Sequence, residues 1–301
     1  MAIYLLGMLT IIIPATLILW LTLSTTKNKL DWVLRSVLVS FTVFIFYKIG
    51  LWSLTSYYLR YILLFLFAFT FLYSLSKNIN TPYNFTVFLS PVNYLLLLFT
   101  LASFILSVFI LKGSTFNHSK TIGLSFPFAQ GKYLVLQGGS NFSTNPFHNQ
   151  ASSASYALDI IKLNRLGNRA TQLFPEQLKQ YNIFNEEVLS PCTGTVQVAV
   201  DNQIDNPPGH VNTKQPAGNH LILLCDDVKI FLAHLQQNSL RVSEGEHVRT
   251  GQSLAMVGNS GFTDEPHLHL QANDFNNKPV TILFNSKSYS INDIYSTSQN
   301  R

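Results

Sequence analysis

Apolar residues follow two different patterns along the chain, and the change falls near residue 112. Residues 1–112 contain four long, almost unbroken apolar stretches, and Asp31 is their only acidic residue. Residues 113–301 instead contain short apolar runs separated by Gly, Pro, Asn and Asp. We therefore predict two parts, a membrane region at 1–112 and a separate folded domain at 113–301.

The four long stretches are predicted to be transmembrane helices, at residues 3–23, 36–54, 57–75 and 93–111. A helix needs about 20 mostly apolar residues to cross the hydrocarbon core of a bilayer. The first stretch lacks a basic segment before it and an obvious cleavage site, so we expect it to be retained rather than removed as a signal peptide. The predicted role of the four helices is to anchor the chain.

Basic residues in the connections between these helices indicate their orientation. Lys27, Lys29 and Arg35 lie between the first two stretches, and Lys77 follows the third. Connections rich in Lys and Arg tend to remain in the cytoplasm. This places the N-terminus outside, and four spans return the chain to the outside before residue 113. Lys112 alone opposes this arrangement.

Short apolar runs in the second part predict β-strands at residues 132–139, 194–200, 220–225, 228–235, 253–258 and 268–272. Turn-forming residues bound each run. Residues 174–184 are the best candidate for a helix, with Pro175 near its start. Many short strands with long turns predict an all-β domain, built as an antiparallel sheet or open barrel.

Charge and cysteine content narrow the functional classes. The net charge of +5 is mild, the basic residues are scattered, and no aromatic RNA-binding signature is present. We therefore expect no binding to nucleic acid. Cys192 and Cys225 do not form a CxxC pattern. They could form a disulfide in a domain outside the cytoplasm, or be two buried thiols, and their spacing leaves both alternatives open.

The histidines carry the candidate chemistry. In the segment "EPHLHLQ", at 265–271, His267 and His269 are two residues apart. In a strand both would project from one face, as a polar patch or as part of a metal site. His234 ends the run 228–235, and Asp159 lies among apolar neighbours in "YALDI". An unpaired buried carboxylate is costly, and a zinc ion held by three protein ligands would pair it.

Several motifs in the second part resemble the M23 (lysostaphin/LytM-type) zinc metallopeptidases. The resemblance is carried by "AHLQ", "VSEGEHVRTGQSL", "VGNSG" and "PHLHLQ", which occur in this order within residues 217–271. "SPCTGTV", at 190–196, resembles the strand that opens the family's core. "YALDI", preceded by His148, resembles its upstream metal-binding segment. The resemblance extends over about residues 132–284 and implies a LytM-like β domain.

The resemblance also implies roles for five residues. The ligands of a Zn²⁺ cofactor would be His148, Asp159 and His269, and the catalytic pair that does not bind the metal would be His234 and His267. One departure concerns the first two ligands, because the usual family pattern is HxxxD, whereas here a longer insert separates His148 from Asp159. The alternatives for the first ligand are His210 and His220.

The function implied by this resemblance is that of a membrane-anchored zinc metalloendopeptidase. It would hydrolyse peptide bonds, in cross-links or bridges of peptidoglycan, from the inner membrane of a bacterial cell with its domain periplasmic or extracellular. The alternative is a catalytically inactive M23-like domain that binds the cell wall or regulates another enzyme. A biotinyl- or lipoyl-like carrier shares the glycine rhythm but needs an exposed lysine at a hairpin turn, and "VGNSG" has none.

Overall fold

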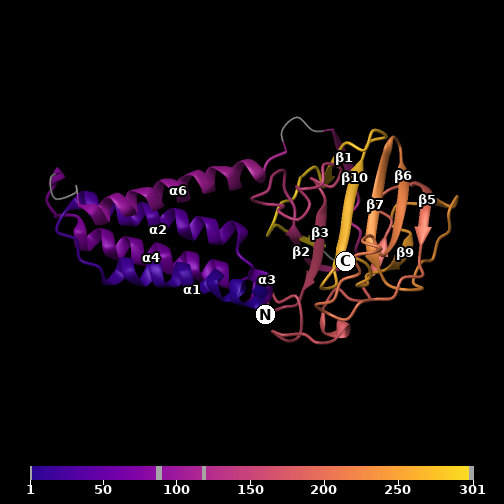
Figure 1. Ribbon diagram of the computed structural model, residues 1–301, viewed down its shortest axis with the longest axis horizontal. Coiled ribbons are helices and arrows are strands. Elements are labelled where there is room, and N and C mark those ends of the chain that lie inside the picture. Colours follow the sequence, from indigo (N-terminus) through magenta and orange to yellow (C-terminus); the bar gives the residue numbers. More distant parts are fainter. Residues whose placement is uncertain (1, 86–89, 117–119, 298–301) are drawn as a thin grey trace. The chain divides into compact units, whose positions relative to one another are not determined.

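The computed structural model describes residues 2–85, 90–116 and 120–297 (Figure 1). The chain divides into two compact units, Met1–Leu111 and Lys112–Arg301. The first is helical and the second is built mainly of strands (Figure 1).

The first unit consists of α1 (Ala2–Leu23), α2 (Lys29–Ile49), the short α3 (Trp52–Thr55), α4 (Leu59–Asn78) and most of α6 (Pro91–Gly113). The four long helices are apolar enough to cross a membrane, as predicted. The helix predicted at 36–54 in fact begins earlier, at Lys29. The side chain of Asn28 caps it by accepting a hydrogen bond from the backbone N–H of Leu30, 3.2 Å away. Hydropathy alone does not detect such a polar cap.

The centre of the second unit is one eight-stranded sheet. Its strands, in chain order, are β2 (Gly131–Gln137), β3 (Leu158–Leu163), β5 (Gly194–Val200), β6 (Asn219–Cys225), β7 (Val228–Leu235), β8 (His247–Val248), β10 (Leu268–Asn273) and β12 (Ile294–Thr297). Their spatial order is β12-β2-β3-β10-β7-β6-β5-β8, and every neighbouring pair is antiparallel. The predicted antiparallel β domain is therefore confirmed.

Two smaller strand pairs lie beside this sheet. β4 (Glu187–Leu189) pairs with β9 (Ser253–Met256) in antiparallel fashion. β1 (Thr121–Leu124) pairs with β11 (Thr281–Phe284) in parallel, a departure from the antiparallel expectation.

Alternation of buried and partly exposed residues explains how the strands form the core. In β6, Leu221, Leu223 and Cys225 are buried, and the residues between them are partly exposed. Leu268 and Leu270 of β10 are fully buried, as predicted for one face of the segment that holds the histidine pair. Because the period of a strand is two, His269, which lies between these leucines, is held on the opposite face.

The predicted helix at 174–184 is wrong, because the structure contains only a single 3₁₀ turn there, η1 (Leu178–Gln180). The side-chain oxygen of Gln180 accepts hydrogen bonds from the backbone N–H groups of Glu176 and Gln177, which closes the turn. Tyr181 is buried and forms an extended bridge with Ala170. Tertiary packing of Tyr181 thus stops the helix after one turn.

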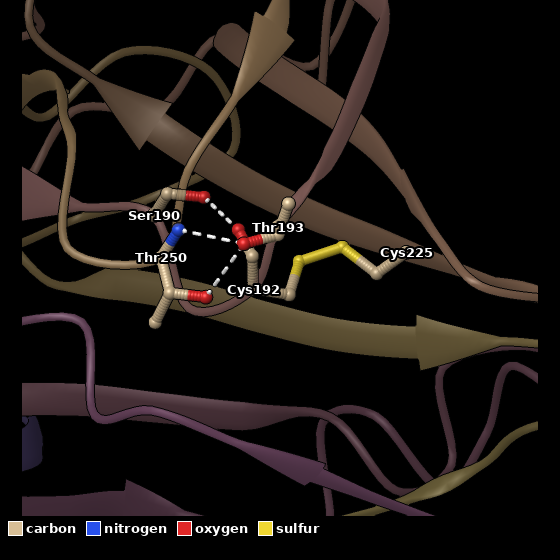
Figure 2. The surroundings of a disulfide bond; sticks show 5 residues. All are labelled: Ser190, Cys192, Thr193, Cys225 and Thr250. Atoms are coloured by element: carbon tan, nitrogen blue, oxygen red, sulfur yellow. Dashed lines mark hydrogen bonds between the residues drawn. A yellow bond between two sulfur atoms is a disulfide. The ribbon is translucent and has the colours of Figure 1, made fainter.

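Cys192 and Cys225 are joined by a disulfide (Figure 2). Cys192 lies in the turn before β5, and Cys225 ends β6. The hydroxyl of Ser190 donates to the carbonyl of Cys192 across 2.7 Å, which shapes the turn (Figure 2). Of the two alternatives for the cysteines, the structure therefore has the covalent pair.

Candidate active site

Three predicted metal ligands come together on one face of the sheet. The candidate ligand atoms of His148, Asp159 and His269 all lie within 4.8 Å of one another. Asp159 in β3 and His269 in β10 are directly opposite each other in the antiparallel ladder. His269 Nδ1 lies 3.1 Å from Asp159 Oδ1, and His148 Nε2 lies 3.4 Å from Asp159 Oδ2. The sheet register thus sets two of the three positions.

His148 lies in the loop between β2 and β3 and is held by Asn145. The Asn145 side chain is fully buried, and its Oδ1 lies 2.9 Å from His148 Nδ1. Its amide nitrogen donates to the carbonyl oxygens of Ser155 and Ala157, at 3.2 Å and 3.0 Å. These two bonds leave Oδ1 as the acceptor, so His148 Nδ1 carries the proton and Nε2 has a free lone pair. Asn145 thus folds the long insert back and orients the ring.

His269 is oriented by Gln271, two residues further along β10. Its Nε2 lies 3.3 Å from Gln271 Oε1, while Gln271 Nε2 donates to the carbonyl of Ser153 across 3.0 Å. The oxygen of Gln271 therefore faces the ring, and His269 Nε2 is the donor. Nδ1 of His269 faces Asp159 Oδ1 and is the nitrogen that would bind a metal. The contact with Ser153 also joins the insert to β10.

His234 and His267 lie beside this cluster. Their ring centroids are 4.8 Å apart, and His267 Nε2 lies 3.5 Å from Asp159 Oδ1. In both rings Nδ1 donates to a backbone carbonyl, that of Ser260 for His234 at 2.8 Å and that of Glu265 for His267 at 2.9 Å. A carbonyl oxygen only accepts, so each Nδ1 is the donor and each Nε2 remains for chemistry.

The backbone at His234 has an unusual conformation. Its φ is 61°, in the left-handed region that a residue with a side chain seldom adopts. The pairing of β6 with β7 shifts register here, between Asn219 and Leu221. Such an irregularity redirects a side chain, and backbone strain of this kind is concentrated at functional sites. The position of the His234 ring therefore depends on this bulge.

The charges of the cluster follow from burial and proximity. Burial alone would raise the pKa of Asp159, but the neighbouring His148 and His267 hold it well below its usual range. Burial lowers the pKa of His148 to about 4, against the opposing effect of Asp159. Burial alone would lower the pKa of His267, but Asp159 raises it to about 9. Burial, with His267 and His269 nearby, lowers the pKa of His234 well below its usual value.

The three candidate ligands fit a zinc ion. Two imidazole nitrogens and one carboxylate form a donor set that zinc uses in catalytic sites. At neutral pH Asp159 is ionised and His148 is neutral, which are the forms that bind a metal. Asn145 and Gln271 supply hydrogen bonds to the non-ligating nitrogens of His148 and His269, as is usual around metal-bound imidazoles.

The two alternatives for the first ligand lie elsewhere. His210 is exposed and contacts the carbonyl of Pro208. His220 contacts the carbonyl of Gly218, with its ring 5.4 Å from that of Phe231. All five predicted site residues are thus near one another, and neither alternative belongs to the group that could hold a metal. The individual roles of the five stay predictions.

Four supporting residues were not identified from the sequence. Gln271 follows His269 by two, so the period of the strand could have placed it on the same face. The contact between Asn145 and His148 depends on loop closure and has no sequence signal. Arg169 Nε lies 2.7 Å from Glu265 Oε2 in a buried ion pair, and the Glu265 carbonyl holds His267.

Comparison with known proteins identifies the second unit's relatives. Residues 181–282 match the sequence model of a protein family described as "Peptidase family M23". The matched segment includes His234, His267 and His269 but leaves out His148 and Asp159. A search of curated proteins found no match.

Solved structures of peptidases are similar to this chain at low sequence identity. A zinc-containing peptidase from Vibrio cholerae is 20% identical over 53% of this chain and 39% of its own, with a TM-score of 0.33. The lysostaphin catalytic domain from Staphylococcus simulans is 17% identical over 52% of this chain and 82% of its own, with a TM-score of 0.27. This chain thus spans about two fifths of the length of the Vibrio cholerae peptidase.

Proposed function

Because the chain contains an M23 peptidase domain at residues 181–282, we propose that it is a membrane-anchored zinc metalloendopeptidase. Its substrate would be peptide bonds in the cross-links or bridges of bacterial peptidoglycan. The observation that carries this proposal is the convergence of five side chains. The atoms of His148, Asp159 and His269 lie within 4.8 Å of one another, and His234 and His267 lie next to them.

In this proposal His148, Asp159 and His269 hold the metal. Zinc bound there supplies Lewis-acid activation of water and of the scissile carbonyl. The remaining chemistry belongs to the two other histidines. His234 is neutral, and the bond from its Nδ1 to Ser260 leaves Nε2 as a proton acceptor. It is therefore suited to act as general base.

His267 has the complementary role. In the metal-free site Asp159 raises its pKa to about 9, and its Nδ1 is held by the Glu265 carbonyl. Its Nε2–H faces the cluster, 3.5 Å from Asp159. A fixed donor there would stabilise negative charge on the carbonyl oxygen during attack. The proposed pair thus combines one proton acceptor with one hydrogen-bond donor.

The proposed location is the inner membrane of a bacterium, with the second unit on the outer side. The Cys192–Cys225 disulfide supports this, because structural disulfides persist outside the reducing cytoplasm. The basic residues between the apolar helices support the same orientation. Peptidoglycan is the peptide-cross-linked polymer that such a domain would meet there.

The test uses the full-length chain in detergent, loaded with zinc and incubated with purified peptidoglycan. We expect new peptide termini, identified by mass spectrometry, and loss of this activity in His267→Ala with zinc still bound. Gln150→Ala is the matched control, because this exposed residue lies in the same insert but outside the cluster. A zinc-loaded parent chain that cleaves no peptide bond would favour the non-catalytic binding module instead.

A further inference from the structure

The loop at 140–147, which immediately precedes His148, has two different sides. Phe142 and Phe147 are 61% and 74% exposed. Thr144 and Asn145, between them in the sequence, are fully buried. The loop therefore has a fixed polar interior and presents two aromatic side chains outward, where burial in water-free surroundings would be favourable.

This loop is bonded directly to the point where the α6 helix ends. The carbonyl oxygen of Gly113, the last residue of α6, accepts from the backbone N–H of Ser140 at 2.8 Å and from the hydroxyl of Thr144 at 3.1 Å. Ser140 also donates to the carbonyl of Thr115. Gly113 is buried, and a Cβ there would collide with the side chains of Asn141 and Thr144. The approach is therefore close and specific.

A second contact ties the far end of the insert to the same segment. The ring of Phe116, three residues after Gly113, packs edge-on against Tyr156 with centroids 5.5 Å apart. Residues 113–116 thus hold both the start and the end of the segment that carries His148. Loop 140–147 therefore lies against residues 113–116, which belong to the same unit.

We propose that loop 140–147 docks on the surface of the bilayer that α6 crosses, with Phe142 and Phe147 among the lipid headgroups. This inference rests on the proposed membrane anchoring. The 23 residues of α6 give a helix about 34 Å long at about 1.5 Å per residue. The hydrocarbon core is about 30 Å thick, so Gly113 falls close to its boundary. Residues hydrogen-bonded to Gly113 fall there too, at the depth where aromatic side chains are favoured.

The docking has a consequence for the substrate. His148 directly follows Phe147, so the docked loop would keep the first metal ligand next to the membrane. The enzyme would then act on peptide strands that lie close to the bilayer, in preference to those deeper in the wall. In this proposal the two aromatic side chains contact lipid rather than a protein partner.

The test measures the depth of spin labels on the full-length chain in vesicles of phosphatidylethanolamine and phosphatidylglycerol. The described cysteines are both in the disulfide, so a label on an introduced cysteine is specific. The test variants are Phe142→Cys and Phe147→Cys. Phe275→Cys, at an exposed position between β10 and β11, is the control for water, and Phe104→Cys in α6 is the control for lipid.

Accessibility of each label to oxygen, which concentrates in lipid, is compared with its accessibility to a water-soluble nickel complex. We expect the oxygen-to-nickel ratio at 142 and 147 to be several-fold higher than at 275. Equal ratios at 142, 147 and 275, with lipid exposure at 104, would overturn the docking and leave the anchoring intact. Exposure of the label at 104 to water would overturn both. Hydrolysis of peptidoglycan by the unlabelled chain is scored separately, so the peptidase proposal fails or holds independently.

Discussion

Asn145 Oδ1 lies 2.9 Å from Nδ1 of His148, and this hydrogen bond determines which nitrogen of the ring faces Asp159. The same Asn145 side chain holds two backbone carbonyls of the insert that separates His148 from Asp159. The longer spacing between the two candidate ligands is therefore compatible with a compact site, because one buried amide both closes the loop and orients the ring.

Replacing Asn145 should weaken zinc binding. We expect Asn145→Ala to lower zinc affinity about 10- to 100-fold, the usual effect of removing a hydrogen bond to a metal-bound imidazole. The measurement is competition with a chromogenic chelator on the detergent-solubilised chain. Gln150→Ala, an exposed change in the same insert, should bind zinc like the parent. If both variants bound zinc equally well, Asn145 would have no part in positioning His148.

The histidine pair of "HLH" should divide its roles between metal and substrate. His269→Ala should lose both zinc and activity, because it removes one of three ligands. His267→Ala should keep about one zinc per chain and lose activity. Elemental analysis of bound zinc, together with an assay of peptidoglycan hydrolysis, distinguishes the two variants. Equal loss of zinc from the two variants would show that the assignment of His267 as a residue that does not bind the metal is wrong.

The six strands predicted from the sequence all correspond to observed ones, whereas β3 and β8 are among those that were missed. β6 and β7 alternate or carry compact apolar runs, and both were expected close to their observed bounds. β3, the central strand that carries Asp159, is buried at five of its six positions and has no alternation to reveal it. β8, with two residues, depends on its pairing with β5 rather than on its own pattern.

The site was predictable as a set of residue types and not as a geometry. His267 and His269 follow from the period of a strand, and the sheet register brings Asp159 opposite His269. The left-handed backbone of His234 arises from a bulge between β6 and β7, which depends on pairing across strands. No local signal in the sequence reports such pairing, and the same holds for the contact between Asn145 and His148.

The buried ion pair of Arg169 and Glu265 should contribute far more to the free energy of unfolding than an exposed ion pair. Arg169 and Glu265 are 2.7 Å apart with side chains 2% and 12% exposed. Glu265→Gln removes the carboxylate charge that lies 2.7 Å from a buried guanidinium, so we expect the free energy of unfolding to fall by about 3 kcal/mol. Pulse proteolysis in urea measures it.

The matched control is the exposed pair of Arg241 and Glu187, whose side chains are 46% and 44% exposed. Glu187→Gln should cost about 1 kcal/mol or less, because water screens such pairs. Similar losses in the two variants would contradict a special role for the buried pair.

The disulfide should stabilise the second unit, and its oxidation state in cells should show whether this unit lies outside the reducing cytoplasm. Cys192 and Cys225 are 33 residues apart, and a cross-link closing a loop of this size contributes about 4 kcal/mol. The double variant Cys192→Ala/Cys225→Ala should lose about this much in the same proteolysis assay. In chain extracted from membranes under alkylating conditions, both cysteines should resist modification until reduced. Prompt alkylation without reduction would contradict the proposed orientation of the domain.

The stability of the second unit should also fall at alkaline pH because of Tyr133. This residue is fully buried, and its hydroxyl donates to the carbonyl of Gln130, with Glu186 Oε1 3.0 Å away. Burial raises the pKa of Tyr133 well above its usual value of about 10, and the Glu186 carboxylate raises it further. The folded state therefore keeps a proton that the unfolded state loses above about pH 10.

The sign of the effect follows from this difference. The contribution of Tyr133 is fully present below about pH 10 and is lost as the pH rises above that value, at about 1.4 kcal/mol per pH unit. Tyr133→Phe should be less stable than the parent at about pH 8, by about 1 kcal/mol for the lost hydrogen bond. Above about pH 10 its stability should fall less steeply than that of the parent. Pulse proteolysis in urea, at about pH 8 and above about pH 10, tests this prediction. Parallel pH profiles of stability for parent and variant would show that Tyr133 is not the group responsible.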